Sequence, residues 1–98
     1  MPGDISLVHV GFGNVLAMNR VIAIISPGSA PTKRLLQEAK NNGMVVDITN
    51  GRRTKAVAVM DSGHVVLAAI TPETIAGRLM AFRQNGSREM DQDELHAL

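Results

Sequence analysis

Apolar and polar positions alternate in short runs along the first part of the chain, and glycine or proline separates the runs. Residues 5–10, 15–18 and 20–26 are predicted to be strands because β-branched and other apolar side chains dominate them. A glycine-rich turn at residues 11–14 joins the first two, since glycine and asparagine accept the positive φ that a tight reversal needs. Residues 19–20 interrupt the apolar pattern, which indicates a bulge or a corner; the sequence leaves both open.

A helix is predicted over residues 30–42. Ser29 is a suitable N-cap, and Pro31 stands near the first helical position, where its missing N–H does no harm. Asn42 and Gly43 form the stop signal at the other end. The apolar positions of this helix share one side: Leu35, Leu36 and Ala39.

Three further strands are predicted over residues 44–49, 55–60 and 65–70. Asn50-Gly51 between the first two is a strong hairpin signal, because a type I′ turn requires positive φ at both central residues. A second tight reversal, at residues 61–64, joins the last two. The three strands are therefore predicted to form an antiparallel meander.

A second helix is predicted to begin at Thr71-Pro72, with a hydroxyl as N-cap and proline at the first helical position, and to end at Gly86. Its apolar stripe is spaced i, i+4, i+7: Ile75, Leu79 and Phe82. The elements together predict an α+β fold, a small and mostly antiparallel sheet with two helices. Residues 1–86 are expected to form this single domain, and residues 87–98 a polar, acidic and flexible tail.

Composition narrows the class of protein. The chain has 98 residues, of which 45% are apolar, so wholesale disorder is excluded. Its apolar runs fall far short of the roughly 20 residues of a membrane span, and no basic leader precedes them, so a cytoplasmic protein without a membrane partner is expected. With no cysteine, a disulfide framework, a thiolate metal site and a cysteine nucleophile are all excluded.

Aromatic residues make up only 2% of the chain, so the core must be aliphatic. Some of this aliphatic surface is expected to lie between subunits, because obligate homo-oligomers bury interfaces that resemble a divided core. A symmetric assembly larger than a dimer is therefore predicted, with a well-packed monomer as the alternative.

Charge is strongly segregated although the net charge is only +1. Residues 20–55 carry seven basic and two acidic side chains, a net charge of +5. Residues 56–98 carry three basic and six acidic side chains, a net charge of −3. A basic middle beside an acidic end indicates that one face of the fold meets a polyanion.

Enzyme motifs are absent from the sequence. Gly11-Phe12-Gly13 begins like a dinucleotide-binding loop, but position 16 is leucine and a strand follows where a helix should open. The three histidines stand far apart, and the acidic residues 91–94 fit a solvated tail better than a metal site. The candidate serines all have turn or capping explanations: Ser26, Ser29 and Ser62. No catalytic, cofactor, metal or small-molecule substrate site is therefore predicted.

The basic residues are better candidates for a site. Arg52, Arg53 and Lys55 follow directly on the Asn50-Gly51 turn, which would project them from the sheet. Arginine makes bidentate contacts to phosphate and to guanine edges, so this position suits DNA; the alternative is an ordinary solvated hairpin end. Arg20 interrupts an otherwise apolar segment and is expected at a sheet end, with an intramolecular salt bridge as its alternative.

Several blocks of residues, in order and without large gaps, resemble the RemA family of bacterial regulators of extracellular-matrix (biofilm) genes. The resemblance covers about residues 5–82 and is carried by these blocks: residues 10–14, 18–20, 26–34, 43–44, 51–54, 59–62 and 72–74, with Asp47. It implies a DNA-binding transcriptional regulator that is not an enzyme. It also implies a ring-like homo-oligomer whose subunits resemble the LytTR type of DNA-binding domain in their β-rich part.

In this resemblance the DNA-contacting arginines of the family fall at Arg20, Arg52 and Arg53, which we expect to converge on one face. Residues 83–98 match no pattern of the family. Repeating the basic patch around a ring would raise its avidity for duplex DNA. The alternatives are an oligomeric module that binds an acidic protein or a nucleotide, and an RNA binder, which the scarcity of aromatic residues disfavours.

Overall fold

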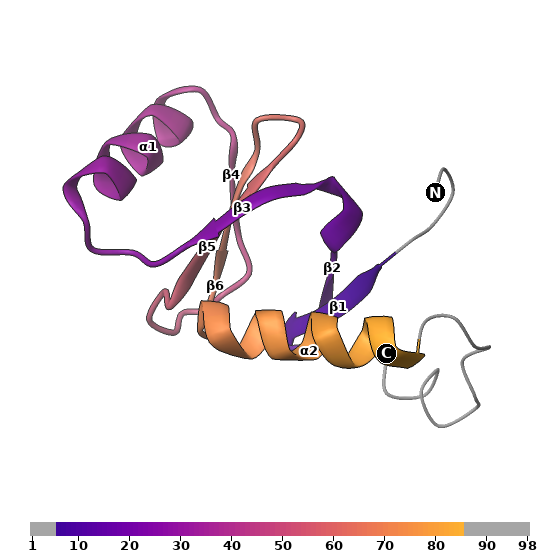
Figure 1. Cartoon of the computed structure of the whole chain (residues 1–98). Coiled ribbons are helices and arrows are strands. Elements are labelled where there is room, and N and C mark those ends of the chain that lie inside the picture. The colour runs from indigo at the N-terminus through magenta and orange to yellow at the C-terminus, as the bar shows by residue number, and fades with distance from the viewer. Residues whose placement is uncertain (1–5, 86–98) are drawn as a thin grey trace.

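The computed structural model describes residues 6–85 of the chain (Figure 1). Within this range, two α-helices and two small, mostly antiparallel sheets confirm the predicted α+β fold. The predicted helix stop at Gly86 and the acidic tail at residues 87–98 lie outside the described residues. The elements in chain order are β1 (Leu7–Gly11), β2 (Asn14–Ala17), the 3-10 helix η1 (Met18–Arg20), β3 (Val21–Ile25), α1 (Ala30–Asn41), β4 (Val45–Asp47), β5 (Ala56–Met60), β6 (Val65–Ala68) and α2 (Pro72–Asn85).

Four strands form the larger sheet, in the order β3-β5-β6-β4. β3 is antiparallel to β5, and β5 is antiparallel to β6 across the predicted reversal at residues 61–64. β4, however, runs parallel to β6 and does not pair with β5. The predicted meander is therefore wrong at its first step.

The burial of each strand agrees with this order, and hydrogen bonds to β6 hold β4 and the connection after it in place. All four residues of β6 and the first three of β5 are buried, so these two strands take the centre of the sheet. β4 has three residues, two of them exposed, which suits an edge strand. At the end of β6, the Leu67 carbonyl accepts a hydrogen bond from the Ile48 N–H (3.0 Å), and the Ala68 carbonyl accepts one from the Lys55 N–H (2.8 Å). β6 is thus hydrogen-bonded to β4 and the residue after it on one side, and to β5 and the residue before it on the other.

The Asn50-Gly51 turn is confirmed, but it does not close a hairpin. Asn50 and Gly51 have φ values of 55° and 80°, as the turn signal predicts. The Arg52 N–H donates to the Thr49 carbonyl (3.0 Å) and closes the turn. The turn therefore begins a longer connection from β4 to β5. This connection passes the end of β6, which lies between the two strands in the sheet.

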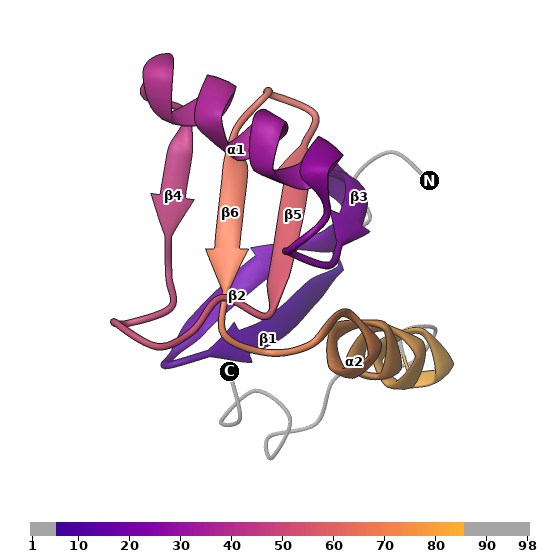
Figure 2. The same cartoon turned by 90° about the vertical axis from the view of Figure 1, so that its left-hand side faces the viewer.

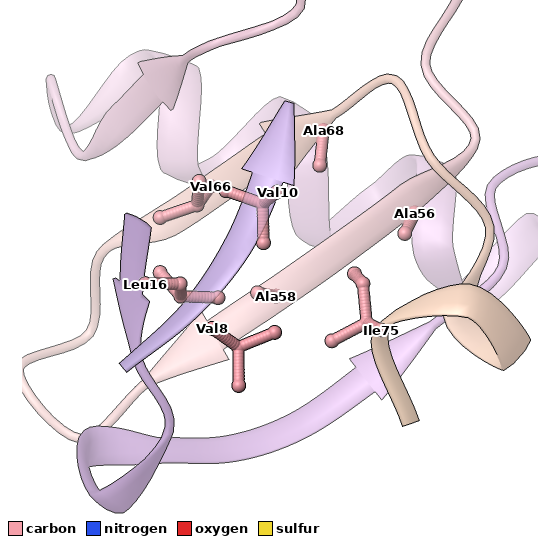
Figure 3. Close-up of a cluster of buried hydrophobic side chains, with 8 residues drawn as sticks. All are labelled: Val8, Val10, Leu16, Ala56, Ala58, Val66, Ala68 and Ile75. Atoms are coloured by element: carbon pink, nitrogen blue, oxygen red, sulfur yellow. The ribbon is translucent and has the colours of Figure 1, made fainter. Parts of the chain in front are cut away.

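β1 and β2 form a separate antiparallel hairpin that packs on one face of the larger sheet. Alternate residues of β5 and β6 point toward it, and their small side chains let the hairpin approach closely (Figure 3). One buried side chain from α2 completes this core. The cluster consists of Val8, Val10, Leu16, Ala56, Ala58, Val66, Ala68 and Ile75.

α1 covers the opposite face of the sheet (Figure 2). Its predicted start is confirmed, since the Ser29 hydroxyl accepts a hydrogen bond from the Thr32 N–H (3.3 Å). Its predicted stop is also confirmed, with Asn42 as the C-cap and Gly43 at a φ of 67°. The intervening residues of β5 and β6 meet this helix and form a second buried cluster: Ala39, Val57, Val65 and Leu67.

α2 lies beside β1, and its predicted start is confirmed. The Thr71 hydroxyl accepts a hydrogen bond from the Thr74 N–H (3.2 Å). Ile75 is fully buried, and the Arg78 guanidinium donates to the His9 carbonyl (3.0 Å), which ties the helix to β1. No helix among residues 6–85 is long and apolar enough to cross a membrane.

The interruption at residues 19–20 is a corner, since Met18–Arg20 form a 3-10 turn between β2 and β3. This turn carries the chain from the small hairpin to the edge of the larger sheet. The carbonyl of Arg20 accepts a hydrogen bond from the Asp61 N–H (2.8 Å). Arg20 is thereby placed at the β5–β6 turn.

Candidate nucleic-acid interface

The connection between β4 and β5 carries three of the predicted site residues, and we call its residues 50–55 the basic loop. Asp47 and Thr49, just before this loop, are joined by two hydrogen bonds, which we call the Asp47–Thr49 lock. The Oδ1 of Asp47 accepts hydrogen bonds from the Thr49 N–H (2.9 Å) and from the Thr49 hydroxyl (2.6 Å). Thr49 is buried, with 2% of its surface exposed. The point at which the basic loop leaves the sheet is therefore fixed.

The same two hydrogen bonds determine the ionisation of Asp47. Donation from the Thr49 hydroxyl, and then from the Thr49 N–H, lowers the pKa of Asp47 below its usual value, against a smaller opposing effect of desolvation. The carboxylate is thus ionised at neutral pH, and this is the form that accepts both hydrogen bonds.

Arg52, Arg53 and Lys55 are all exposed on the basic loop. The backbone N–H of Arg52 bonds to Thr49, and that of Lys55 to Ala68, so both ends of the loop are tied down. Among residues 6–85, none of these three cations forms an ion pair with a carboxylate. Three exposed cations on a tied loop form a positive patch whose guanidinium groups match phosphate oxygens or guanine edges.

Phe12, which sequence reasoning did not single out, lies against this patch. The Cζ of Arg52 is 5.6 Å from the centroid of the Phe12 ring, within the range of a cation–π interaction. The two residues are far apart in the sequence, and the contact depends on how the small hairpin packs on the sheet. No local pattern could have revealed it.

Arg20 lies at the other end of the sheet. The basic loop enters β5 at Ala56, whereas Arg20 bonds to Asp61, just beyond Met60. The five residues of β5, at about 3.3 Å each, separate the two ends. Within a single subunit Arg20 thus lies apart from the other two arginines, and the expectation that all three share one face stays a prediction.

The alternative for Arg20, an intramolecular salt bridge, is present. Its Nε donates to the Oδ2 of Asp61 at 2.7 Å, and the side chains of Arg20 and Asp61 are 61% and 44% exposed. An ion pair this exposed contributes at most about 1 kcal/mol to stability. A phosphate group can therefore compete for the guanidinium of Arg20 at little cost.

Other candidate chemistry remains weak in the part of the chain that the structure describes. No group of three or more His, Asp or Glu side chains there could hold a metal ion. Ser62 Oγ lies 2.7 Å from His64 Nδ1, but the same hydroxyl also accepts from the His64 N–H (3.4 Å). This pair is a local contact of the β5–β6 turn. The acidic residues 91–94 lie outside the described range.

The sequence matches known proteins over most of its length. A family model described as "RemA-like: Extracellular matrix regulatory protein A-like" matches residues 7–79, which include both the basic loop and Arg20. A protein of Dehalococcoides mccartyi, strain BAV1, is 59% identical over 92 residues, covering 93% of this chain and 96% of the relative. One from Clostridium acetobutylicum is 50% identical over 91 residues, covering 93% and 98%. Both carry the name "Putative regulatory protein".

Proposed function

Because the chain belongs to the RemA-like family of extracellular matrix regulatory proteins, we propose that it is a DNA-binding transcriptional regulator of matrix (biofilm) genes, acting in the cytoplasm without catalysis. Duplex DNA is the proposed partner, and the basic loop is the proposed contact. The family and the names of its members support a regulatory role, to which we add DNA binding and the control of matrix genes.

The observation that carries the proposal is the basic loop itself. Its three cations are exposed and have no carboxylate partner among residues 6–85, and its backbone is tied to the sheet at both ends. Protein contacts to DNA go largely to phosphate oxygens, which fix orientation, while contacts to base edges supply specificity. Arg52 and Arg53 can divide these tasks.

One subunit with so few cations would bind DNA weakly, with a non-specific Kd of about 10⁻⁴–10⁻⁶ M at physiological salt. We therefore include a closed homo-oligomeric ring in the proposal, because repeated patches make later contacts intramolecular. Exposed aliphatic side chains on both edge strands of the sheet support it. Ile22 on β3 is 68% exposed and Val46 on β4 is 43% exposed. Such edges suit a head-to-tail interface whose rotation closes.

The position of Arg20 fits the same assembly. Arg20 directly precedes the edge strand β3, and the basic loop follows the other edge strand, β4. A ring closed through these two edges repeats both basic elements in every subunit. In this proposal the repeated arginines form one continuous DNA-facing surface.

The experiment is a competition measurement combined with a particle mass. A fluorescent duplex bound to the intact chain is displaced by unlabelled duplex, by RNA of the same sequence and by heparin, and anisotropy is recorded. We expect duplex to compete better than RNA. Native mass spectrometry should show more than two copies of the 10.5 kDa chain, with and without DNA. RNA that competes as well as duplex would contradict the proposed ligand, and a monomer would contradict the ring.

A further inference from the structure

Phe12 occupies an unusual place for a large apolar side chain. It is one of two phenylalanines in the chain, and 49% of its surface is exposed at the tip of the β1–β2 turn. Its φ of 56° lies in the left-handed region, where glycine or asparagine is the usual residue. Neither core packing nor local backbone preference explains a phenyl ring at this position.

The turn that carries Phe12 is held firmly. The Asn14 side-chain amide donates to the carbonyl of Gly11 (3.0 Å) and to that of Phe12 (3.5 Å). Gly11 also lies close to the sheet, since a Cβ built there would be 3.9 Å from the Cγ2 of Ile70. Ile70 follows the end of β6 at which the basic loop is anchored. The hairpin tip is thus fixed beside that loop.

The ring accounts for the side-chain position of Arg52. The Arg52 backbone is set by its bond to Thr49, and its guanidinium lies over the Phe12 ring at 5.6 Å from the centroid. A free arginine side chain loses rotamer freedom when it binds, which weakens binding. A guanidinium already resting on an aromatic face loses less, because the ring confines it while its N–H groups remain free to donate.

We propose that Phe12 is a positioning residue for DNA binding: its ring holds the guanidinium of Arg52 in the orientation that meets the duplex. This inference rests on the proposed function, since it assigns a residue to the same site. It gives the exposed ring a role without requiring that the ring itself touch DNA. Contact of Phe12 with the bases, as in proteins that wedge apolar side chains between base steps, is the competing outcome.

A double-mutant cycle separates the two. Duplex affinity is measured by anisotropy at one fixed salt concentration for wild type, Phe12→Leu, Arg52→Ala and the double variant. We expect Phe12→Leu to weaken binding about three- to tenfold. It should cause no further loss in the Arg52→Ala background, because the residue that it positions is gone. Equal losses in both backgrounds would overturn the positioning role and indicate direct contact with DNA.

Two further variants make the test sharper. Phe12→Tyr keeps the aromatic face and should bind DNA as wild type does. Val15→Ala is the matched control, because it trims exposed apolar surface in the same hairpin without removing the ring. Phe12→Leu should also keep the salt dependence of wild type, because no charge is lost. A Phe12→Tyr variant as weak as Phe12→Leu would overturn the proposal. Melting temperature and particle mass of each variant show whether folding and assembly are intact.

The proposed function can fail separately from this inference. If Arg52→Ala and Arg53→Ala both bind DNA as tightly as wild type, the basic loop is not the DNA site, and the role of Phe12 fails with it. If Arg52→Ala weakens binding while Phe12→Leu does not, the site stands and only the positioning role of Phe12 is overturned.

Discussion

Arg20 and Asp61, 41 positions apart in the chain, form a 2.7 Å charged hydrogen bond at the end of β5 opposite the basic loop. The pair links the residue directly before the edge strand β3 to the first residue of the β5–β6 turn. It also places a negative charge beside a guanidinium that the proposed function assigns to DNA.

Asp61→Asn should therefore strengthen DNA binding a few-fold, because it removes a charge that repels phosphate and releases the Arg20 side chain. Stability should change by less than about 1 kcal/mol, as expected for an exposed pair. Glu38→Gln on the exposed face of α1 removes the same charge elsewhere and serves as the control. Anisotropy titrations at matched salt measure both variants. An equal gain from Glu38→Gln would show that only net charge matters.

The core between the hairpin and the sheet depends on Ile75, which is fully buried. Ile75→Ala should lower the free energy of unfolding by about 2–5 kcal/mol, the usual cost of such a truncation. Met80 on the same helix is 61% exposed, so Met80→Ala should cost less than about 0.5 kcal/mol. Urea denaturation measures both values. Similar values for the two variants would argue against this packing of α2.

Two glycines should respond in opposite directions to alanine. Gly51 has a φ of 80° in the turn before the arginines, so Gly51→Ala should destabilise the protein by about 1 kcal/mol. Gly77 lies within α2, and a Cβ there would meet nothing within 4 Å. Gly77→Ala should stabilise by about 0.5–1 kcal/mol, the difference between the two residues inside a helix. Thermal unfolding of each variant is the measurement.

The Asp47–Thr49 lock should make part of the stability dependent on pH. Hydrogen bonds from Thr49 lower the pKa of Asp47 in the folded state, so its contribution is complete above the unfolded pKa and is lost as the pH falls through the folded pKa. Asp47→Ala should therefore destabilise the protein at neutral pH, and the difference from wild type should shrink below about pH 4. Urea titrations over this range measure it. A difference independent of pH would show that the ionised carboxylate is not involved.

Local signals predicted the parts of the fold that local physics determines. The caps at Ser29 and Thr71 formed as expected, and so did the reversal between β5 and β6. Asn50 and Gly51 adopted their predicted φ values. The sequence could not show which strand pairs with β4, because a two-residue turn signal predicts the reversal but not whether the strands on either side of it pair with each other.

The candidate site was predictable in its residue types but not in its geometry. The basic loop is exposed as the charge pattern indicated. The separation of Arg20 from that loop follows from strand order and register, which one sequence does not reveal. The contact between Phe12 and Arg52 is a tertiary contact between two turns, so it could not be predicted from the sequence either.

The most direct test of the account is the salt dependence of DNA binding by the double variant Arg52→Ala/Arg53→Ala. Its control is Lys33→Ala/Arg34→Ala, which removes two exposed charges from α1 instead. For wild type, log K against log[salt] should fall with a slope of about −0.9 per neutralised phosphate. The basic-loop variant should bind far more weakly and with a shallower slope, at unchanged particle mass, while the α1 variant stays close to wild type. Equal affinity and slope for the basic-loop variant and wild type would contradict the assignment of this loop to DNA.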